Sequence, residues 1–141
     1  MKENTIRNDY GILLIDDDRD WSRAYCQWIH TNLGCQTKHV RTVKDGLNEL
    51  RLFKIFFCVL LDLGLNLETE SGLDVIPLFT KEFPNIPLIV LSGNLDTTTI
   101  NLARNKGAMW CLDKPYSEYS YRQNTAMIIK AWQEFSKYYF R

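Results

Sequence analysis

The chain has 141 residues, and its 17 basic and 17 acidic side chains give a formal net charge of zero. This length fits one domain, and 45% hydrophobic and 24% charged residues are an ordinary balance for a globular protein. The balanced charge argues against direct binding of nucleic acid, and no run of Lys and Arg marks a site for an anionic membrane surface.

Neither a signal peptide nor a membrane span is expected from the distribution of apolar residues. Residues 1–10 are polar and are expected to form an N-terminal extension, and the longest apolar runs, 55–61 and 88–91, are too short to cross a bilayer. Four cysteines occur without CxxC spacing, which argues against disulfides and a zinc site: Cys26, Cys35, Cys58 and Cys111. We therefore expect a protein of the reducing cytoplasm.

Strand and helix patterns alternate along the rest of the chain. Strands are expected at residues 11–16, 36–40, 55–62, 87–92 and 109–112, and helices at residues 19–33, 42–53, 71–83, 96–104 and 117–139. Each crossover is long enough for a helix, so the five repeats predict a parallel sheet with helices on both faces.

Local composition refines four of these elements. The run 55–62 is continuously apolar and is expected to be buried on both faces, whereas the mostly polar run 36–40 is expected at or near an edge of the sheet. The first helix carries Trp21 among apolar side chains at helical spacing. In the third helix, Ser71 is a candidate N-cap, and Pro77 is expected near the first turn or at a kink.

Polar side chains follow four of the expected strands, at the point where each strand ends. Asp16 and Asp17 come at the end of the first strand, Asp62 ends the third, Ser92 ends the fourth and Lys114 follows the fifth. Because the carboxyl ends of parallel strands meet at one edge of a sheet, we expect these side chains to converge there.

The expected cluster suits a divalent cation and a phosphoryl group. Neighbouring carboxylates repel one another unless a cation is bound, and an all-oxygen ligand set favours Mg²⁺ or Mn²⁺ over zinc. A metal ion, a hydroxyl and an ammonium can each hold one phosphoryl oxygen. The alternative for residues 16–18 is a simple helix cap, but a carboxylate such as Asp62 at the end of the most apolar strand has no evident structural role.

Lys114 precedes Pro115, and the sequence leaves both isomers of this peptide bond open. A cis bond at Pro115 would turn the chain sharply and fix the direction of Lys114.

The chain resembles the receiver domain of two-component response regulators over nearly all of residues 11–141. The resemblance rests on the order of an acid pair, a single Asp, a Ser and a Lys-Pro pair. The resemblance implies an α/β, flavodoxin-like (βα)5 fold, a doubly wound parallel five-stranded sheet of order 2-1-3-4-5. The receiver domain would span residues 11–141, with the long helix expected at residues 117–139 as its last element.

The resemblance assigns the metal ligands and the phosphoacceptor. Asp62 would accept the phosphoryl group and also bind Mg²⁺. Asp17 would bind Mg²⁺ directly, Asp16 mainly through water, and Gly64 through its backbone carbonyl.

Two further residues take their roles from the same resemblance. Ser92 would bind a phosphoryl oxygen after transfer, and Lys114 would pair with the acyl phosphate.

The chain departs from the family pattern at its switch position. The residue three before the Lys is commonly aromatic and moves inward when the Ser moves; here it is Cys111, which is too small to report in that way. Trp110 is expected to point to the opposite side of the strand and not to substitute for that aromatic residue.

The loop after Asp62 and the residues near the phosphoryl group also differ. Asn66 and Glu70 stand where the family usually has Pro and Gly. Gly64 and Asn94 lie two residues after Asp62 and Ser92, at positions that tune the lifetime of the phosphoryl group in the family.

The last helix is apolar on more than one side. One stripe contains Ile128 and Phe135 and another contains Trp132. Such a helix is either a longer core helix or one with a second partner, such as another copy of the chain in a homodimer.

The function expected from these observations is a signalling phosphoacceptor, not an enzyme beyond its own phosphorylation and dephosphorylation. Its partners would be a histidine kinase or a phosphotransfer protein and an unidentified downstream partner. The 141 residues leave no room for an output domain. Two alternatives are a degenerate receiver that binds partners without phosphorylation and a phosphatase resembling the haloacid dehalogenase superfamily, built on Asp16 and Asp18.

Overall fold

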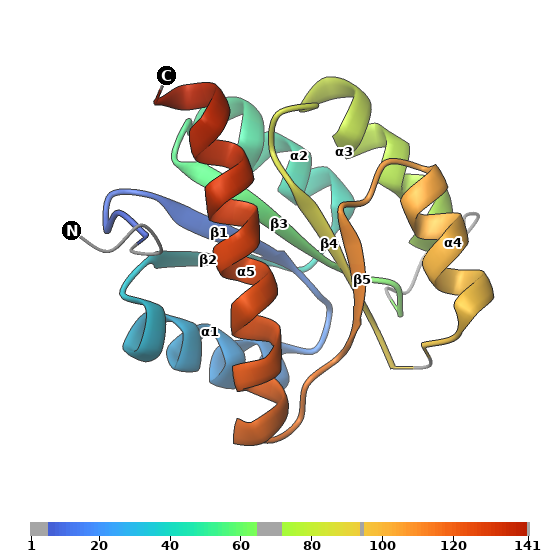
Figure 1. Cartoon of the computed structure of the whole chain (residues 1–141), viewed down its shortest axis with the longest axis horizontal. Coiled ribbons are helices and arrows are strands. Elements are labelled where there is room, and N and C mark those ends of the chain that lie inside the picture. Colours follow the sequence, from blue (N-terminus) through green and yellow to red (C-terminus); the bar gives the residue numbers. More distant parts are fainter. Residues whose placement is uncertain (1–5, 65–71, 94, 141) are drawn as a thin grey trace.

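The computed structural model describes residues 6–64, 72–93 and 95–140. Figure 1 shows a single sheet with α1 and α5 on one face and α2, α3 and α4 on the other. All paired strands are parallel, and the strand order is β2-β1-β3-β4-β5. The predicted flavodoxin-like fold is therefore confirmed.

The strands and helices alternate in the expected order. Their bounds are β1 (Gly11–Ile15), α1 (Arg19–Leu33), β2 (Gln36–Val40), α2 (Val43–Leu52), β3 (Phe56–Asp62), η1 (Gly72–Val75), α3 (Ile76–Glu82), β4 (Leu88–Ser92), α4 (Thr97–Asn105), β5 (Trp110–Asp113) and α5 (Glu118–Tyr139).

Three helices begin one residue later than expected, because the first residue expected in each is an N-cap. The side chains of Thr42, Asp96 and Ser117 each accept a hydrogen bond from the backbone N–H three residues later. The third helix differs more, since it opens with the 3-10 turn η1 and becomes α-helical at Ile76. Pro77 lies in the first turn of α3, where its missing N–H is tolerated, and Ser71 lies outside the described residues.

The sheet separates two apolar cores. All seven residues of β3 are buried, and from Cys58 to Leu61 they alternate between the cores because successive side chains of a strand point to opposite faces. Phe57 and Leu60 pack with the core under α1 and α5, whereas Val59 and Leu61 pack with the core under α2, α3 and α4. This burial on both faces is the predicted environment of β3.

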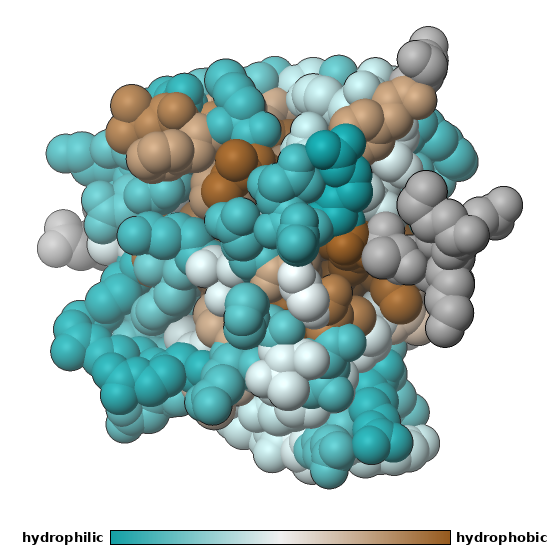
Figure 2. Space-filling view, turned by 90° about the vertical axis from the view of Figure 1, so that its left-hand side faces the viewer, coloured by the Kyte–Doolittle hydropathy of each residue, from teal (hydrophilic) through white to brown (hydrophobic). Residues whose placement is uncertain are grey.

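Strand β2 forms one edge of the sheet, as its polar sequence predicts. Gln36 and Lys38 are exposed, and only Val40 is buried. Figure 2 shows the side of the molecule on which β2 and α1 lie, and most of that surface is hydrophilic.

The second apolar stripe of α5 is largely covered by the chain itself. The Trp132 ring is 5% exposed, and its centroid lies 5.2 Å from Phe57, 5.5 Å from Tyr10 and 5.8 Å from Phe140. Tyr10 of the N-terminal extension therefore covers this stripe, which favours the longer core helix of the two alternatives for Trp132. Within the described residues, no helix is both long and apolar enough to cross a membrane.

Replacing Trp132 with Ala is expected to lower the free energy of unfolding by about 3–5 kcal/mol, the usual loss for a buried Trp. Leu52→Ala is the matched control, because Leu52 is 72% exposed and its loss should change stability by less than about 0.5 kcal/mol. Urea unfolding followed by far-UV circular dichroism measures both. Equal losses in the two variants would contradict the burial of Trp132 inside this chain.

Candidate functional site

The carboxyl edge of the sheet brings together the charged and hydroxyl residues predicted from the strand ends. Asp16 directly follows β1, Asp62 and Ser92 are the last residues of β3 and β4, and Lys114 directly follows β5. The ladder continues past β5, because the Lys114 N–H donates to the Ser92 carbonyl at 3.0 Å. Asp16, Asp62 and Ser92 are all buried.

Three carboxylates form the acidic part of the site. Asp16, Asp17 and Asp62 each place a carboxylate oxygen within 4.8 Å of the others. Backbone N–H groups fix one oxygen on two of them: Asp18 donates to Asp16 Oδ1 at 2.7 Å and Gly64 donates to Asp62 Oδ1 at 3.0 Å. The Oδ2 atoms of Asp16 and Asp62 both face Lys114.

The Lys114 ammonium lies between the two buried carboxylates. Its Nζ is 2.8 Å from Asp16 Oδ2 and 3.6 Å from Asp62 Oδ2. Burial alone would lower the pKa of Lys114, but the interactions with Asp16 and Asp62 outweigh it and raise that pKa. Lys114 is therefore charged at neutral pH.

The electrostatic environment of Asp62 is unfavourable to its charged form. Burial raises the pKa of Asp62, and the charges of Asp16 and Asp17 raise it further, against the hydrogen bond from Gly64 and the charge of Lys114. An added cation beside Asp62 would oppose both effects.

The donor set fits Mg²⁺ or Mn²⁺. Asp16 Oδ2 is buried, and among the described residues it is paired with the Lys114 ammonium alone. Three carboxylates and one ammonium leave a formal excess of negative charge, and all the ligands offered are oxygens, which hard divalent cations prefer and zinc does not.

The Lys114–Pro115 peptide bond is trans, so the cis alternative is wrong. The direction of the chain is instead fixed by two hydrogen bonds, from the Lys114 N–H to Ser92 and from Trp21 Nε1 to the Pro115 carbonyl at 2.7 Å.

The positions that depart from the family pattern are only partly described. Cys111 is buried in the core under α2, α3 and α4, and the Trp110 ring lies against the Arg104 guanidinium at 4.8 Å. Asn94, Asn66 and Glu70 lie outside the described residues, so their expected influence stays a prediction.

Two residues at the site were not recognised from the sequence. Trp21 was counted as a packing residue of its helix, yet its ring centroid lies 4.4 Å from Lys114 Nζ. His39 has no sequence signal for a place at the site, yet its Nε2 donates to the Asp16 carbonyl at 2.6 Å and so holds the end of β1. Neither contact has a sequence signal, because both join segments that are distant along the chain.

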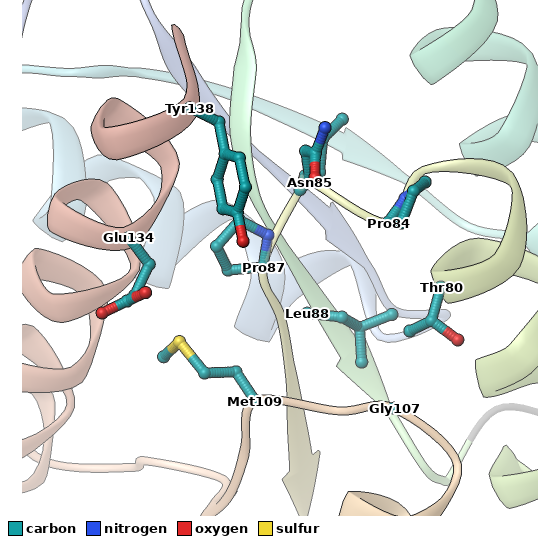
Figure 3. A pocket seen from close by; sticks show the side chains of 10 residues that line it. Thr80, Pro84, Asn85, Pro87, Leu88, Gly107, Met109, Glu134 and Tyr138 are labelled. Atoms are coloured by element: carbon teal, nitrogen blue, oxygen red, sulfur yellow. The ribbon is translucent and has the colours of Figure 1, made fainter. Parts of the chain in front are cut away.

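A separate pocket of about 400 Å³ lies at the opposite edge of the sheet (Figure 3). Pro87 and Leu88 line it where β4 begins, Met109 lines it just before β5, and Glu134 and Tyr138 reach it from α5. This pocket is therefore not part of the carboxylate cluster, which occupies the carboxyl ends of the strands.

Residues 12–125 match the family model of the response regulator receiver domain. The chain belongs to this family. Receiver domains are signalling modules of two-component systems, they generally bind Mg²⁺ through acidic residues, and they receive their signal from histidine kinases or phosphotransfer proteins.

A curated relative is similar to most of this chain. The nitrogen assimilation regulatory protein NtrX of Azorhizobium caulinodans is 25% identical over 108 residues, which are 77% of this chain and 23% of that protein. The receiver domain described here thus spans less than a quarter of that relative's length.

Solved structures share the fold of this receiver domain. A CheY-like response regulator receiver domain protein from Methanospirillum hungatei JF-1 has a TM-score of 0.76 at 22% identity, covering 91% of this chain and 97% of that one. The beryllofluoride-activated NtrC4 receiver domain dimer has a TM-score of 0.74 at 22% identity, covering 89% and 98%.

Replacing Asp62 with Asn is expected to stabilise the receiver domain at neutral pH when divalent cations are absent. Because the pKa of Asp62 is raised, the folded state binds its proton more tightly than the unfolded state does. This tighter proton binding stabilises the folded state at pH values below the pKa of Asp62 in the unfolded chain. The stabilisation is lost as the pH rises through the pKa of Asp62 in the folded state. Asp62→Asn should therefore gain on the order of 1 kcal/mol in free energy of unfolding at pH 7, and the gain should shrink as pH falls toward 4.

Urea unfolding at several pH values in EDTA measures this difference. Glu134→Gln is the control, since Glu134 is only partly buried and lines the pocket at the opposite edge of the sheet, away from the cluster. A lower stability of Asp62→Asn at pH 7 would contradict the unfavourable environment of the charged carboxylate.

Proposed function

We propose that Asp62 accepts a phosphoryl group from the phosphohistidine of a histidine kinase or phosphotransfer protein, in the presence of Mg²⁺. The observation that carries this proposal is the meeting of Asp16, Asp17, Asp62 and the Lys114 ammonium at one buried edge of the sheet. Membership of the receiver family supports it.

In the proposed transfer, a carboxylate oxygen of Asp62 attacks phosphorus. A P–O bond forms as the P–N bond to the donor imidazole breaks, and the imidazole leaves with the electron pair and takes up a proton. Lys114 and the Ser92 hydroxyl then each hold one oxygen of the acyl phosphate. Catalysis of this kind depends mainly on position and electrostatics.

The proposed cation ligands are Asp16, Asp17, Asp62 and the backbone carbonyl of Gly64. When bound, Mg²⁺ offsets charge on the phosphoryl oxygens. The chain contributes the rest of the charge balance, because the Lys114 ammonium is already 2.8 Å from Asp16 and 3.6 Å from Asp62.

The two alternative functions are not favoured. A degenerate receiver that binds partners without phosphorylation does not require the complete set of acceptor, acids and Lys. A haloacid-dehalogenase-like phosphatase needs a further acidic strand end after its Lys, whereas α5 follows Lys114 here. We propose that the chain is not an enzyme beyond its own phosphorylation and dephosphorylation.

The proposal includes a cytoplasmic location, with which four free cysteines agree, and no direct contact with nucleic acid or membrane. It keeps the division into an extension at 1–10 and a receiver domain at 11–141. The downstream partner is unidentified. A homodimer through α5 would use its exposed residues, such as Tyr119 and Tyr138, since Trp132 is covered within the chain.

Incubation with acetyl phosphate and Mg²⁺ is expected to add a single phosphoryl group, and Asp62→Asn should abolish the adduct. Intact-protein mass spectrometry measures it directly. Asp113→Asn is the matched control, because Asp113 is exposed and adjacent to Lys114, and it should still be labelled. Full labelling of Asp62→Asn would overturn the assignment of the acceptor.

Mg²⁺ is expected to raise the thermal unfolding midpoint, because it binds the folded acidic cluster. Asp17→Asn should weaken this binding at least about tenfold, equivalent to about 1.4 kcal/mol. Asp20→Asn is the control for general electrostatics, since Asp20 is an exposed residue in the first turn of α1. A Mg²⁺ titration followed by differential scanning fluorimetry compares the three proteins, and equal affinities would contradict a ligand role for Asp17.

A further inference from the structure

We propose that Trp21 is a positioning residue, which holds the Lys114 ammonium and the backbone of Pro115 in the geometry that phosphoryl transfer requires. This inference rests on the proposed transfer to Asp62.

Trp21 contacts the segment that directly follows β5 through two interactions. Its indole Nε1–H donates to the Pro115 carbonyl at 2.7 Å in a buried hydrogen bond, and its ring centroid lies 4.4 Å from Lys114 Nζ. One side chain of α1 thus contacts both the backbone and the ammonium of a dipeptide 93 and 94 residues further along the chain. The second contact is a cation–π interaction, in which the ring face attracts the charge.

The indole itself is held in place by other aromatic rings. Trp21 is 8% exposed, and its centroid lies 5.0 Å from Tyr25, which is fully buried, and 6.4 Å from Tyr116. These neighbours restrict rotation of the ring. The packing of α1 therefore fixes the position of the ring against which Lys114 lies.

Core packing alone does not account for these contacts. An aliphatic side chain of similar volume would fill the same space, but it would leave the Pro115 carbonyl without its indole donor and the Lys114 ammonium without a π face. The indole N–H and the cation–π contact of Trp21 therefore hold the segment that carries Lys114.

Because the Trp21 ring is neutral, it can hold Lys114 without adding negative charge to the carboxylate cluster. Lys114 must be available to the phosphoryl group on Asp62, but it is drawn toward Asp16 at 2.8 Å. A further carboxylate used as an anchor would hold Lys114 back and add negative charge to a cluster of three. The Trp21 ring attracts the ammonium without adding a net charge, so Lys114 can turn from Asp16 toward Asp62 and keep this contact.

The test compares phosphorylation rates of single and double variants with acetyl phosphate and saturating Mg²⁺. Trp21→Leu is expected to slow labelling of Asp62 about tenfold, with Mg²⁺ affinity unchanged within about twofold. Trp21→Phe, which keeps a ring face and loses the N–H donor, should restore part of the rate. Trp28→Leu is the matched control, because Trp28 lies on the same helix against Tyr121.

The decisive arm is a double-mutant cycle with Lys114→Met. If Trp21 acts through Lys114, Trp21→Leu has no further effect on the residual rate in the Lys114→Met protein. Multiplication of the two effects would instead indicate a purely structural role and overturn the proposal, as would a normal rate in Trp21→Leu. Circular dichroism checks that each variant is folded. If Trp21→Leu is not folded, the same double-mutant cycle is measured with Trp21→Phe.

Wild type and Asp62→Asn are measured in the same series. Absence of labelling in the wild-type protein would overturn the proposed function and this inference together. If the wild-type protein is labelled and the Trp21 variants are labelled at the same rate, the role of Trp21 alone is overturned.

Discussion

The parallel direction of all five strands is the constraint on which the rest of the structure depends. It places every strand end at one edge, so residues spread from Asp16 to Lys114 become neighbours. The central strand β3 is buried on both faces, and its last residue, Asp62, therefore ionises in a poorly solvated place. The electrostatics of the site follow from this topology.

Lys114 offsets part of the negative charge of the site, because two carboxylates share it. One ammonium faces two carboxylates, at 2.8 Å and 3.6 Å, while a third carboxylate lies within the same cluster. The backbone supplies further restraint, through the N–H groups of Asp18 and Gly64. Such a cluster is arranged for added positive charge and for a group whose oxygens Lys114 can bind, and both requirements agree with the chemistry of receiver domains.

The sequence was sufficient to predict a parallel sheet and the residues that converge at its edge, because both follow from apolar runs and from the residues that end them. The strand order was implied only by the resemblance to receiver domains. It was less informative where contacts join distant segments. Helical spacing shows that Trp21 faces inward, but not that its indole meets Pro115, which is 94 residues away. The same limit applies to Trp132, whose second cover comes from Tyr10 in a segment with no strand or helix pattern. The isomer at Pro115 depends on contacts of this kind as well.

The composition of β2 bears on how this domain can associate. An edge strand with unpaired backbone groups is a template for another strand, and a Lys on such a strand opposes that pairing. Lys38 stands at the middle of β2, exposed and 3.9 Å from Glu49 of α2. Joining two sheets across this edge would desolvate the ammonium, so Lys38 opposes the addition of a strand from another chain there.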